Sequence, residues 1–433
     1  MRIAHAFSYG HKLSVRSAML AFAALVALLS ASPAYALQPL SEFVAAARRT
    51  STDARQAALT TVQREAEAAV TRGQQLPSLA ASGSYTLNQY DAVISSGQGS
   101  IVVQPHHGLS SSVQLSVPLI DVAGWRRTEA ASTTARAAGL SAEATIVDVE
   151  RQVAQYYFQL IGAEAVRRAY ETTLKADEEN YETARGKREE GAATDLDVAR
   201  ASVEVEGIKR NLADQQLTIA LARRALTTLT GIVPSADVPD FDEDLHAETP
   251  LPSWEARIAK TPSVRQAREE MKAAEQQASA ARLALLPTLA ATVTETATNA
   301  PGFVGHHAYF TGTVTATWRL DVPTLARRKS QQAAEDVSRV RAEGAENRAR
   351  DAVHEAWQRI ASGIAACSAA RAQTSAARLA ATTARERYAA GSGTQLELIQ
   401  AERDLSNAEA ARIQAAANLA LARVLLRLAS GEH

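Results

Sequence analysis

A duplication of the sequence at a fixed distance limits the folds that this chain can adopt. Gly191, in "REEGAATDLDVARA" (188–201), and Gly391, in "RYAAGSGTQLELIQA" (387–401), lie 200 positions apart. A shift of 200 aligns the chain to its end, and a shift of 210 aligns the part upstream of an insertion near 88–105. We therefore expect two copies of one structural repeat, residues 37–231 and 255–433, joined by a linker at 232–254.

Each copy predicts a helix, a β-hairpin, a long helix, a tight turn and a second helix. In the first copy, residues 40–75 are rich in alanine and free of proline, which predicts a helix. Residues 83–90 and 109–120 alternate between serine and apolar residues, as strands do. Residues 122–190 predict a helix about 100 Å long, and residues 194–230 one of about 55 Å. The fold class is thus mainly α with a small β part.

The spacing of apolar residues predicts helices that pack side by side. Leu212, Ile219 and Leu226 recur every seven residues, as in nearly parallel helix pairs. The linker is acidic and rich in proline. Counted in residues from Gly191, it should lie at the same height along the long helices as an aromatic cluster. That cluster contains Tyr156, Tyr157 and Trp357. We expect the linker and this cluster to form a belt.

The strand expected over residues 309–318 has one face of hydroxyl side chains and one apolar face. Thr311, Thr313, Thr315 and Thr317 share the first face, and Phe310, Val314, Ala316 and Trp318 share the second. This pattern suits a strand with lipid on one side and water on the other. Four strands per protomer leave unpaired edges, which lipid does not tolerate, so two protomers would give eight strands and three would give twelve. A small soluble sheet packed on helices is the alternative.

Residues 1–36 predict a secretory signal peptide. Three cations precede the apolar run 18–29, and an Ala-x-Ala site ends at Ala36. A signal anchor is the alternative, although the apolar run is short for a membrane span. Removal of the three cations changes the formal net charge from −1 to about −4. This charge gives no indication of binding to nucleic acid.

The mature chain is expected to carry neither a membrane helix nor a lipid anchor. No later stretch has eighteen uninterrupted apolar residues, and no cysteine follows Ala36 directly. The single cysteine, Cys367, excludes a framework of disulfides.

No motif in the sequence points to an enzyme or to a cofactor. The sequence holds no nucleophile elbow, phosphate-binding loop, dinucleotide fingerprint or H-E-x-x-H motif. The pairs His106–His107 and His306–His307 are the only features that resemble a metal site. Adjacent residues of a strand point to opposite faces, so we expect no metal site from either pair.

Six stretches, which follow the order of one protein family and fall in both repeats, carry a resemblance to that family. They are "LPSLAASGSY", "LSVPLIDVAG", "EEGAATDLDVARA", "ALTTLTG", "LLPTLAA" and "RYAAGSGTQLELIQAERDLSNAEAA". With them, the chain resembles the outer-membrane efflux (TolC-like) family of Gram-negative bacteria. The resemblance implies a homotrimer whose twelve strands form a transmembrane β-barrel and whose helices form a long periplasmic α-helical barrel.

The resemblance also implies a function and partners. The family supplies a passive gated duct for efflux or type I secretion in the outer membrane. The duct docks to a periplasmic adaptor protein and to an inner-membrane pump of the RND, ABC or MFS type. A periplasmic coiled-coil scaffold without a pore, or a duct specific for metal ions, is the alternative.

The two glycine-marked turns are the expected sites. Glycine tolerates the left-handed position after a helix, and Thr194–Asp197 and Thr394–Glu397 have the spacing of capping boxes. The resemblance implies that these turns form the periplasmic tip where the adaptor docks. The implied docking residues are Gly191, Ala192, Thr194, Leu196, Gly391, Ser392, Gly393, Thr394 and Leu396.

The resemblance further implies a closed gate at the tip, formed by Asp197, Tyr388, Glu397 and Gln400. We expect the Tyr388 hydroxyl to donate a hydrogen bond to Asp197, and three copies of Glu397 to form an acidic ring. Gly393 stands where the family's best-studied members carry an arginine, and Gln400 where they carry an acidic residue. Both the closure and the ring are therefore expected to be weaker here.

Overall fold

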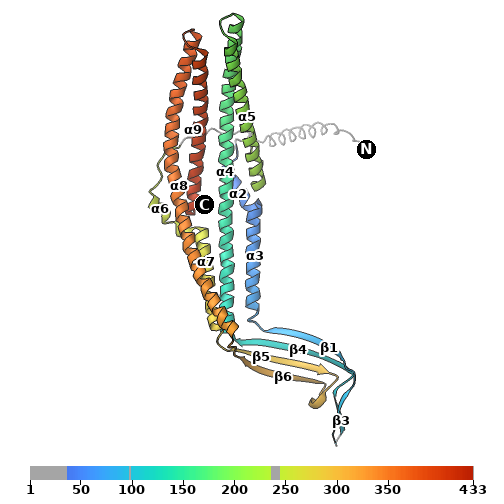
Figure 1. Ribbon diagram of the computed structural model, residues 1–433. Coiled ribbons are helices and arrows are strands. Elements are labelled where there is room, and N and C mark those ends of the chain that lie inside the picture. Colours follow the sequence, from blue (N-terminus) through green and yellow to red (C-terminus); the bar gives the residue numbers. More distant parts are fainter. Residues whose placement is uncertain (1–36, 97–98, 236–243, 433) are drawn as a thin grey trace, which may run out of the picture. The chain divides into compact units, whose positions relative to one another are not determined.

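The computed structural model of the chain describes residues 37–96, 99–235 and 244–432 (Figure 1). The expected signal peptide and linker residues 236–243 lie outside the described residues. In chain order the helices are α2 (Leu40–Thr50), α3 (Thr52–Gly73), α4 (Val122–Glu189), α5 (Asp195–Thr230), α6 (Leu251–Glu255), η1 (Ile258–Lys260), α7 (Pro262–Leu283), η2 (Gly302–Val304), α8 (Val322–Ala389) and α9 (Gln395–Ser430). The strands are β1 (Ser78–Leu87), β2 (Ala92–Ser96), β3 (Gly99–Gln104), β4 (His107–Ile120), β5 (Thr288–Thr298) and β6 (Ala308–Thr317).

The lengths of the helices confirm the internal duplication. Helices α4 and α8 both have 68 residues, and α5 and α9 both have 36. Helices α3 and α7 both have 22 residues. The equal lengths follow the two sequence shifts, so the two copies fold alike.

The helices and strands form two compact units. The first unit holds the described parts of residues 37–46, 153–245 and 366–418, and thus both glycine-marked turns. The second holds the described parts of residues 47–152, 246–365 and 419–432, and thus the sheet. The long helices α4 and α8 contribute residues to both units.

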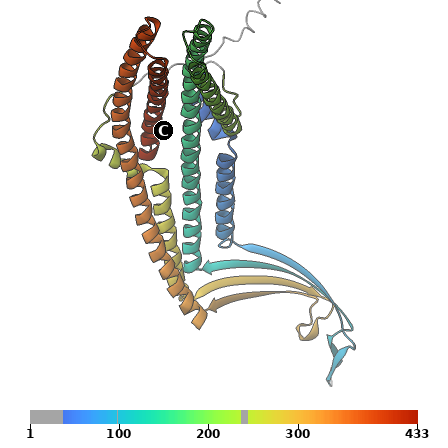
Figure 2. The same ribbon diagram turned by 45° about the horizontal axis from the view of Figure 1, so that its top comes forward.

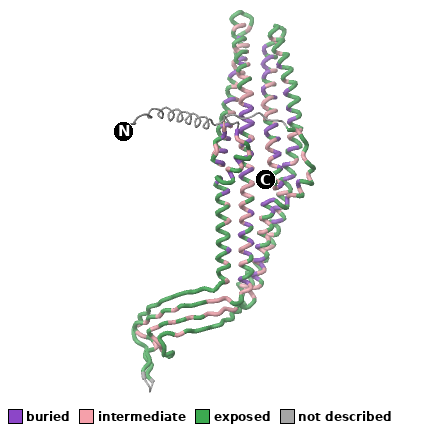
Figure 3. Tube along the Cα trace, turned by 180° about the vertical axis from the view of Figure 1, so that it is seen from behind, coloured by how far each residue is buried: buried purple, intermediate pink, exposed green. Residues whose placement is uncertain are grey.

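In the first unit, α5 packs through the seam that its sequence predicts. Leu212, Ile219 and Leu226 are buried, which confirms the expected side-by-side packing. Figure 3 shows buried residues along the helices of this unit, with exposed residues on their other sides. Phe43 of α2 is fully buried, and its ring centroid lies 5.8 Å from that of Tyr157.

In the second unit, polar contacts fix the short helices and the end of the linker. The Thr61 hydroxyl of α3 donates to the backbone oxygen of Ala138 in α4 (3.3 Å). The Trp357 indole donates to the backbone oxygen of Thr249 (3.0 Å), which confirms that this aromatic residue contacts the linker. The buried Arg423 donates to a carboxylate oxygen of Glu248 at 2.5 Å.

The single helix expected over residues 40–75 is wrong. The helix is interrupted at Ser51, whose hydroxyl accepts a hydrogen bond from the Ala54 backbone N–H (3.3 Å) and caps a new helix. In the second copy, Thr261 and Pro262 mark the same boundary at the start of α7. Serine at an N-cap and proline at the first helical position are both start signals, so the break was visible in the sequence.

The sheet is antiparallel, with the order β1-β4-β5-β6. Figures 1 and 2 both show these strands side by side and curving together. Strand β1 begins at Ser78, five residues before the expected start at 83. Trp318, expected on the last strand, lies one residue beyond the end of β6. The insertion folds as a separate pair of strands, β2 and β3, and β3 lies against η2.

Among the described residues, one helix is long and apolar enough to cross a membrane by length and composition. Helix α9 contains an 18-residue stretch with a mean hydropathy of 1.2, whereas the sequence predicted no membrane helix. Helices buried within a protein share these properties, and 44% of this stretch is buried here. Alanine and leucine raise the mean hydropathy although polar residues interrupt the apolar run.

Candidate functional site

The two glycine-marked turns have the same backbone geometry. Gly191 and Gly391 adopt left-handed conformations, with φ angles of 77° and 74°. In each turn the N–H of the residue after the glycine donates to a carbonyl five residues earlier: Ala192 to Lys187 (2.7 Å) and Ser392 to Arg387 (2.9 Å). This 6→1 bond, together with the bond from each glycine N–H, is the Schellman motif. The predicted left-handed conformation of both glycines after their helices is confirmed.

Both turns are followed by capping boxes. The Thr194 hydroxyl accepts from the Asp197 backbone N–H (3.2 Å), and the Asp197 carboxylate accepts from the Thr194 backbone N–H (3.0 Å). Thr394 and Glu397 repeat both bonds at 3.2 Å. The hydrogen bond from the Thr194 backbone N–H to the Asp197 carboxylate lowers the pKa of Asp197 below its ordinary value, because the ionised carboxylate is the better acceptor.

The turns present small and apolar groups to their surroundings. Ala192 and Ser392 are exposed, and so are Leu196 (56%) and Leu396 (42%), the second residues of α5 and α9. Gly393 has little room, because a Cβ there would lie 3.1 Å from the Arg387 Cβ and 3.2 Å from the Tyr388 backbone nitrogen. Glycine at this position therefore allows the second turn to close tightly.

The hydrogen bond expected between Tyr388 and Asp197 is not present in the described part of the chain. Asp197 is occupied by its capping box, and the Lys187 ammonium lies over the Tyr388 ring, 3.9 Å from its centroid. A second contact joins the two turns: the side-chain amide of Gln395 donates to the backbone oxygen of Asp197 (2.9 Å). The two helical hairpins are thus linked by Lys187 and Gln395, which sequence reasoning missed.

Both missed residues have counterparts under the shift of 200. Lys187 corresponds to Arg387, and Gln395 corresponds to Asp195. The duplication marks these positions as turn residues. It gives no information on which partner each side chain meets, because the partners come from the other repeat.

Glu397 and Gln400 are both exposed on α9. One carboxylate oxygen of Glu397 lies 3.9 Å from the Arg387 guanidinium, so this glutamate is only weakly neutralised within the protomer. Gln400 adds no charge. The structure brings Glu397 near the second turn and leaves its carboxylate accessible.

A buried acidic cluster lies in the same unit as the turns. Asp177 of α4 and Glu402 of α9 are 7% and 5% exposed. Glu402 accepts hydrogen bonds from the Asn180 amide (2.5 Å) and the Arg385 guanidinium (2.8 Å). Burial, followed by repulsion from Glu402 and Glu204, raises the pKa of Asp177 to about 7, against the pull of Arg385. Burial also raises the pKa of Glu402.

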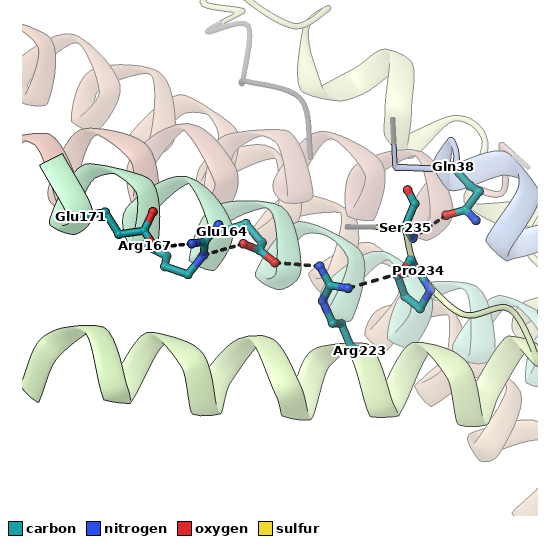
Figure 4. Close-up of polar contacts among 7 residues, drawn as sticks. All are labelled: Gln38, Glu164, Arg167, Glu171, Arg223, Pro234 and Ser235. Carbon is teal, nitrogen blue, oxygen red and sulfur yellow. Dashed lines mark hydrogen bonds and ion pairs between the residues drawn. The ribbon is translucent and has the colours of Figure 1, made fainter. Parts of the chain in front are cut away.

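A second buried carboxylate anchors the start of the linker (Figure 4). Glu164 of α4 is 5% exposed and accepts from Arg167 (2.9 Å) and from Arg223 of α5 (2.8 Å). Arg223 also donates to the Pro234 backbone oxygen (3.4 Å). The Ser235 backbone N–H donates to Gln38 (3.1 Å), so hydrogen bonds with both Arg223 and Gln38 hold the start of the linker.

The pairing register places opposite chemistry on the two faces of the sheet. Residues paired across antiparallel strands share a face, so the register assigns each strand position to one of the two faces. One face is apolar and includes Leu79, Ala81, Val113, Leu115, Val117, Leu289, Ala291, Val293, Phe310, Val314 and Ala316. Glu295 and Ser111 are polar residues on that face.

The other face of the sheet is a surface of hydroxyl groups. It includes Ser82, Ser84, Ser110, Ser112, Ser116, Thr292, Thr294, Thr296, Thr311, Thr313 and Thr315. Ser82 and Ser112 share a hydrogen bond (2.9 Å), as do Ser84 and Ser110 (2.7 Å). The protomer buries neither face in full, as Figure 3 shows.

The histidine pairs form no metal centre in the part of the chain that the structure describes. No group of three or more His, Cys, Asp or Glu side chains is placed there to hold a metal ion. The expectation that neighbouring rings point apart is wrong for the first pair: the His106 and His107 ring centroids are 4.4 Å apart, because His106 precedes β4. His107 instead shares a hydrogen bond with the Tyr85 hydroxyl (2.7 Å).

Comparison with known proteins identifies the family. The chain is 27% identical over 378 residues to the antibiotic efflux pump outer membrane protein ArpC of Pseudomonas putida, covering 83% of this chain and 76% of the relative. The toluene efflux pump outer membrane protein TtgC, also of Pseudomonas putida, matches with the same identity and coverage. A solved membrane protein of Pseudomonas aeruginosa has a TM-score of 0.80 at 23% identity, over 90% of this chain and 93% of that one. The model of the outer membrane efflux protein family matches residues 44–232 and again residues 255–432, and the chain belongs to that family.

Proposed function

We propose that this chain is the outer-membrane duct of a tripartite efflux system, in which three copies close one twelve-stranded barrel. The duct is passive and depends on a periplasmic adaptor and an inner-membrane pump. The observation that carries the proposal is a four-stranded sheet with one apolar and one hydroxyl face. Within the described residues of the protomer, its edge strands β1 and β6 each have a neighbouring strand on one side only.

Open edges explain why one protomer is insufficient. In lipid, every unpaired backbone N–H and C=O group costs several kcal/mol, so membrane strands must form a closed ring. Four strands are fewer than the roughly eight of the smallest bacterial barrels. Pairing β6 of one copy with β1 of the next removes both edges, and places the hydroxyl face around a water-filled lumen.

The two turns support the rest of the proposal. Ala192 and Ser392 leave room for close approach by another helical hairpin, and the exposed Leu196 and Leu396 offer it apolar contacts. The same turns carry the Lys187–Tyr388 and Gln395–Asp197 contacts that hold the two hairpins of a protomer together. We infer that the tips dock the adaptor and that releasing these contacts opens the duct.

Three copies of Glu397 would form an acidic ring at the closed tip. Such a ring attracts cations and is screened by salt. In planar bilayers, Glu397→Gln is expected to reduce the preference of the conductance for cations over anions. Unchanged ion selectivity in this variant would place the constriction elsewhere.

Small organic compounds are the proposed cargo, because relatives are named for the efflux of antibiotics and of toluene. Deleting the gene from its host should lower the tolerated concentration of such compounds. Restored tolerance by the parent protein, and none by the tip variants described below, would support this cargo class.

Disulfide cross-linking between strand edges tests the proposal directly. In a chain freed of its only cysteine by Cys367→Ala, Ser82→Cys on β1 is combined in turn with Thr311→Cys, Thr313→Cys and Thr315→Cys on β6. Oxidation in membranes should link neighbouring copies into dimers and trimers in at least one register. Ser112→Cys, on the interior strand β4, is the matched control and should give no link with the same partners.

A monomer that gives no linked species in any register, and that stays in the soluble periplasmic fraction, would instead support the scaffold without a pore.

A further inference from the structure

A basic and apolar segment joins the last strand of the sheet to its long helix. Residues 318–329, W-R-L-D-V-P-T-L-A-R-R-K, run from the end of β6 into the first turns of α8; we refer to them as the junction segment. Its large apolar side chains are exposed: Trp318 (66%), Leu320 (62%) and Val322 (78%). Its four cations, Arg319, Arg327, Arg328 and Lys329, are exposed as well.

The charge of the junction segment is not balanced locally. Four cations accompany one carboxylate, Asp321, which gives a formal charge of +3. Asp321 itself caps α8 by accepting a hydrogen bond from the Thr324 backbone N–H (2.9 Å). Within the described part of the chain, none of the four cations makes an ion pair or a side-chain hydrogen bond.

The equivalent segment of the first repeat is neutral. Over residues 118–129, Arg126 pairs with Glu129 (2.7 Å) and Arg127 pairs with Asp121 (3.1 Å). Two copies of one repeat thus carry different charge at the same place in the fold. The excess charge of the second copy does not follow from the requirements of the strand-to-helix connection, because the first copy makes that connection without it.

We propose that the junction segment binds the anionic headgroups of phospholipids in the leaflet nearest to it. The proposal rests on the proposed function, since the membrane strands bring this segment to a bilayer. Tryptophan is enriched at membrane interfaces, where its ring is apolar and its N–H is polar. The Trp318 N–H donates to the Leu285 backbone oxygen (2.9 Å), which holds the ring at the end of the sheet.

The cations beside Trp318 suit phosphate groups. Arginine binds a phosphate with two parallel hydrogen bonds, and each cation near an anionic membrane surface raises occupancy about fivefold. Apolar side chains next to cations are the pattern of a segment that lies in the headgroup region.

A second copy of the chain is a poorer partner for these charges. In the proposed barrel, the neighbour would present the start of β1 and the end of α3. The last turn of α3 carries Arg72 and no acidic residue. The carboxylates of Asp121 and Glu129 in the first repeat are already paired with arginines. Charge complementarity therefore favours anionic lipid.

Fluorescence quenching by brominated lipids tests the proposal on the full trimer. The protein is reconstituted in phosphatidylcholine vesicles, and quenching by brominated phosphatidylglycerol is compared with quenching by brominated phosphatidylcholine. We expect a preference for phosphatidylglycerol of at least about fivefold at low salt, falling as sodium chloride is added. In the triple variant Arg327→Gln, Arg328→Gln and Lys329→Gln, which keeps every tryptophan, the preference should fall close to one.

Two controls separate charge from packing. Arg126→Gln with Glu129→Gln removes an ion pair at the equivalent place without changing net charge, and should leave the preference intact. Arg327→Lys with Arg328→Lys keeps the charge and should retain most of the preference. If the triple variant does not insert, the salt dependence of the lipid preference of the parent protein tests the proposal instead. A preference for phosphatidylglycerol that persists at high salt would overturn the proposal.

An unchanged preference in an inserted triple variant would also overturn it. Loss of the preference on adding inorganic phosphate would show a site for free anions instead of lipid. Failure of the parent chain to insert into vesicles would refute the proposed duct, which is a different result from insertion without lipid preference.

Discussion

At the scale of single residues, Asp177 makes the first unit sensitive to pH. Its pKa of about 7 lies above the ordinary value of 3.8, so the folded chain holds a proton there that the unfolded chain has lost. The resulting stabilisation is full below about pH 4 and is lost as the pH rises through 7. The melting temperature, followed by circular dichroism, should therefore decrease as the pH is raised from about 4 to about 7.

Asp177→Asn should remove most of that change and raise stability at pH 8 by about 1–3 kcal/mol, because the amide is neutral at every pH. Glu182→Gln is the matched control, since Glu182 lies on the same helix with its side chain 64% exposed. It should leave the pH dependence unchanged. An equal pH dependence in Asp177→Asn and in the parent would show that this carboxyl group is ionised in the folded protein.

Also at the residue scale, the contact between Lys187 and Tyr388 uses the ring of the tyrosine. Tyr388→Phe keeps a ring for the cation and should leave the resting conductance of the duct nearly unchanged. Lys187→Gln and Tyr388→Ala both remove the contact, worth about 0.5–1 kcal/mol, and should raise resting conductance in planar bilayers. A large increase in Tyr388→Phe alone would show instead that the hydroxyl group closes the tip.

At the scale of elements, the two faces of β6 should respond oppositely to charge. Val314 pairs with Ala291 on the apolar face, and Thr315 pairs with Ala290 on the hydroxyl face. Val314→Arg should cost about 2–4 kcal/mol if it lies near the middle of the bilayer. Thr315→Arg should be much milder because it faces water. Urea unfolding of the inserted protein measures the free energy of unfolding of each variant. Equal losses of this free energy would refute the assignment of faces.

At the scale of the whole molecule, the tips should be necessary for export and dispensable for assembly. Ala192→Trp combined with Ser392→Trp places two bulky rings on exposed turns. Loss of about 2 kcal/mol of adaptor binding, or about thirtyfold in affinity, is expected. Export assays should show the loss while trimers remain in the outer membrane. Leu217→Trp, at an exposed position of α5 away from the turn, is the control and should export normally.

Features that depend on the order of residues along the chain could be predicted before the fold was known. The repeated sequence predicted the duplication. Periodic patterns predicted the lengths of α4 and α5 and the alternating faces of the strands. The backbone freedom of glycine predicted the left-handed turns. Even the break before α3 has a local signal in Ser51, because an N-cap needs only the next three residues.

Features that depend on residues from distant segments became visible only in the folded chain. The pKa of Asp177 is raised because α5 and α9 bring Glu204 and Glu402 against it and packing removes water. Lys187 meets Tyr388 only because the two hairpins pack together, 201 positions apart along the chain. The sequence named Asp197 and Tyr388 as partners, but the capping box takes the Asp197 carboxylate first. A pattern along the chain records which groups are available, and only packing decides which of them meet.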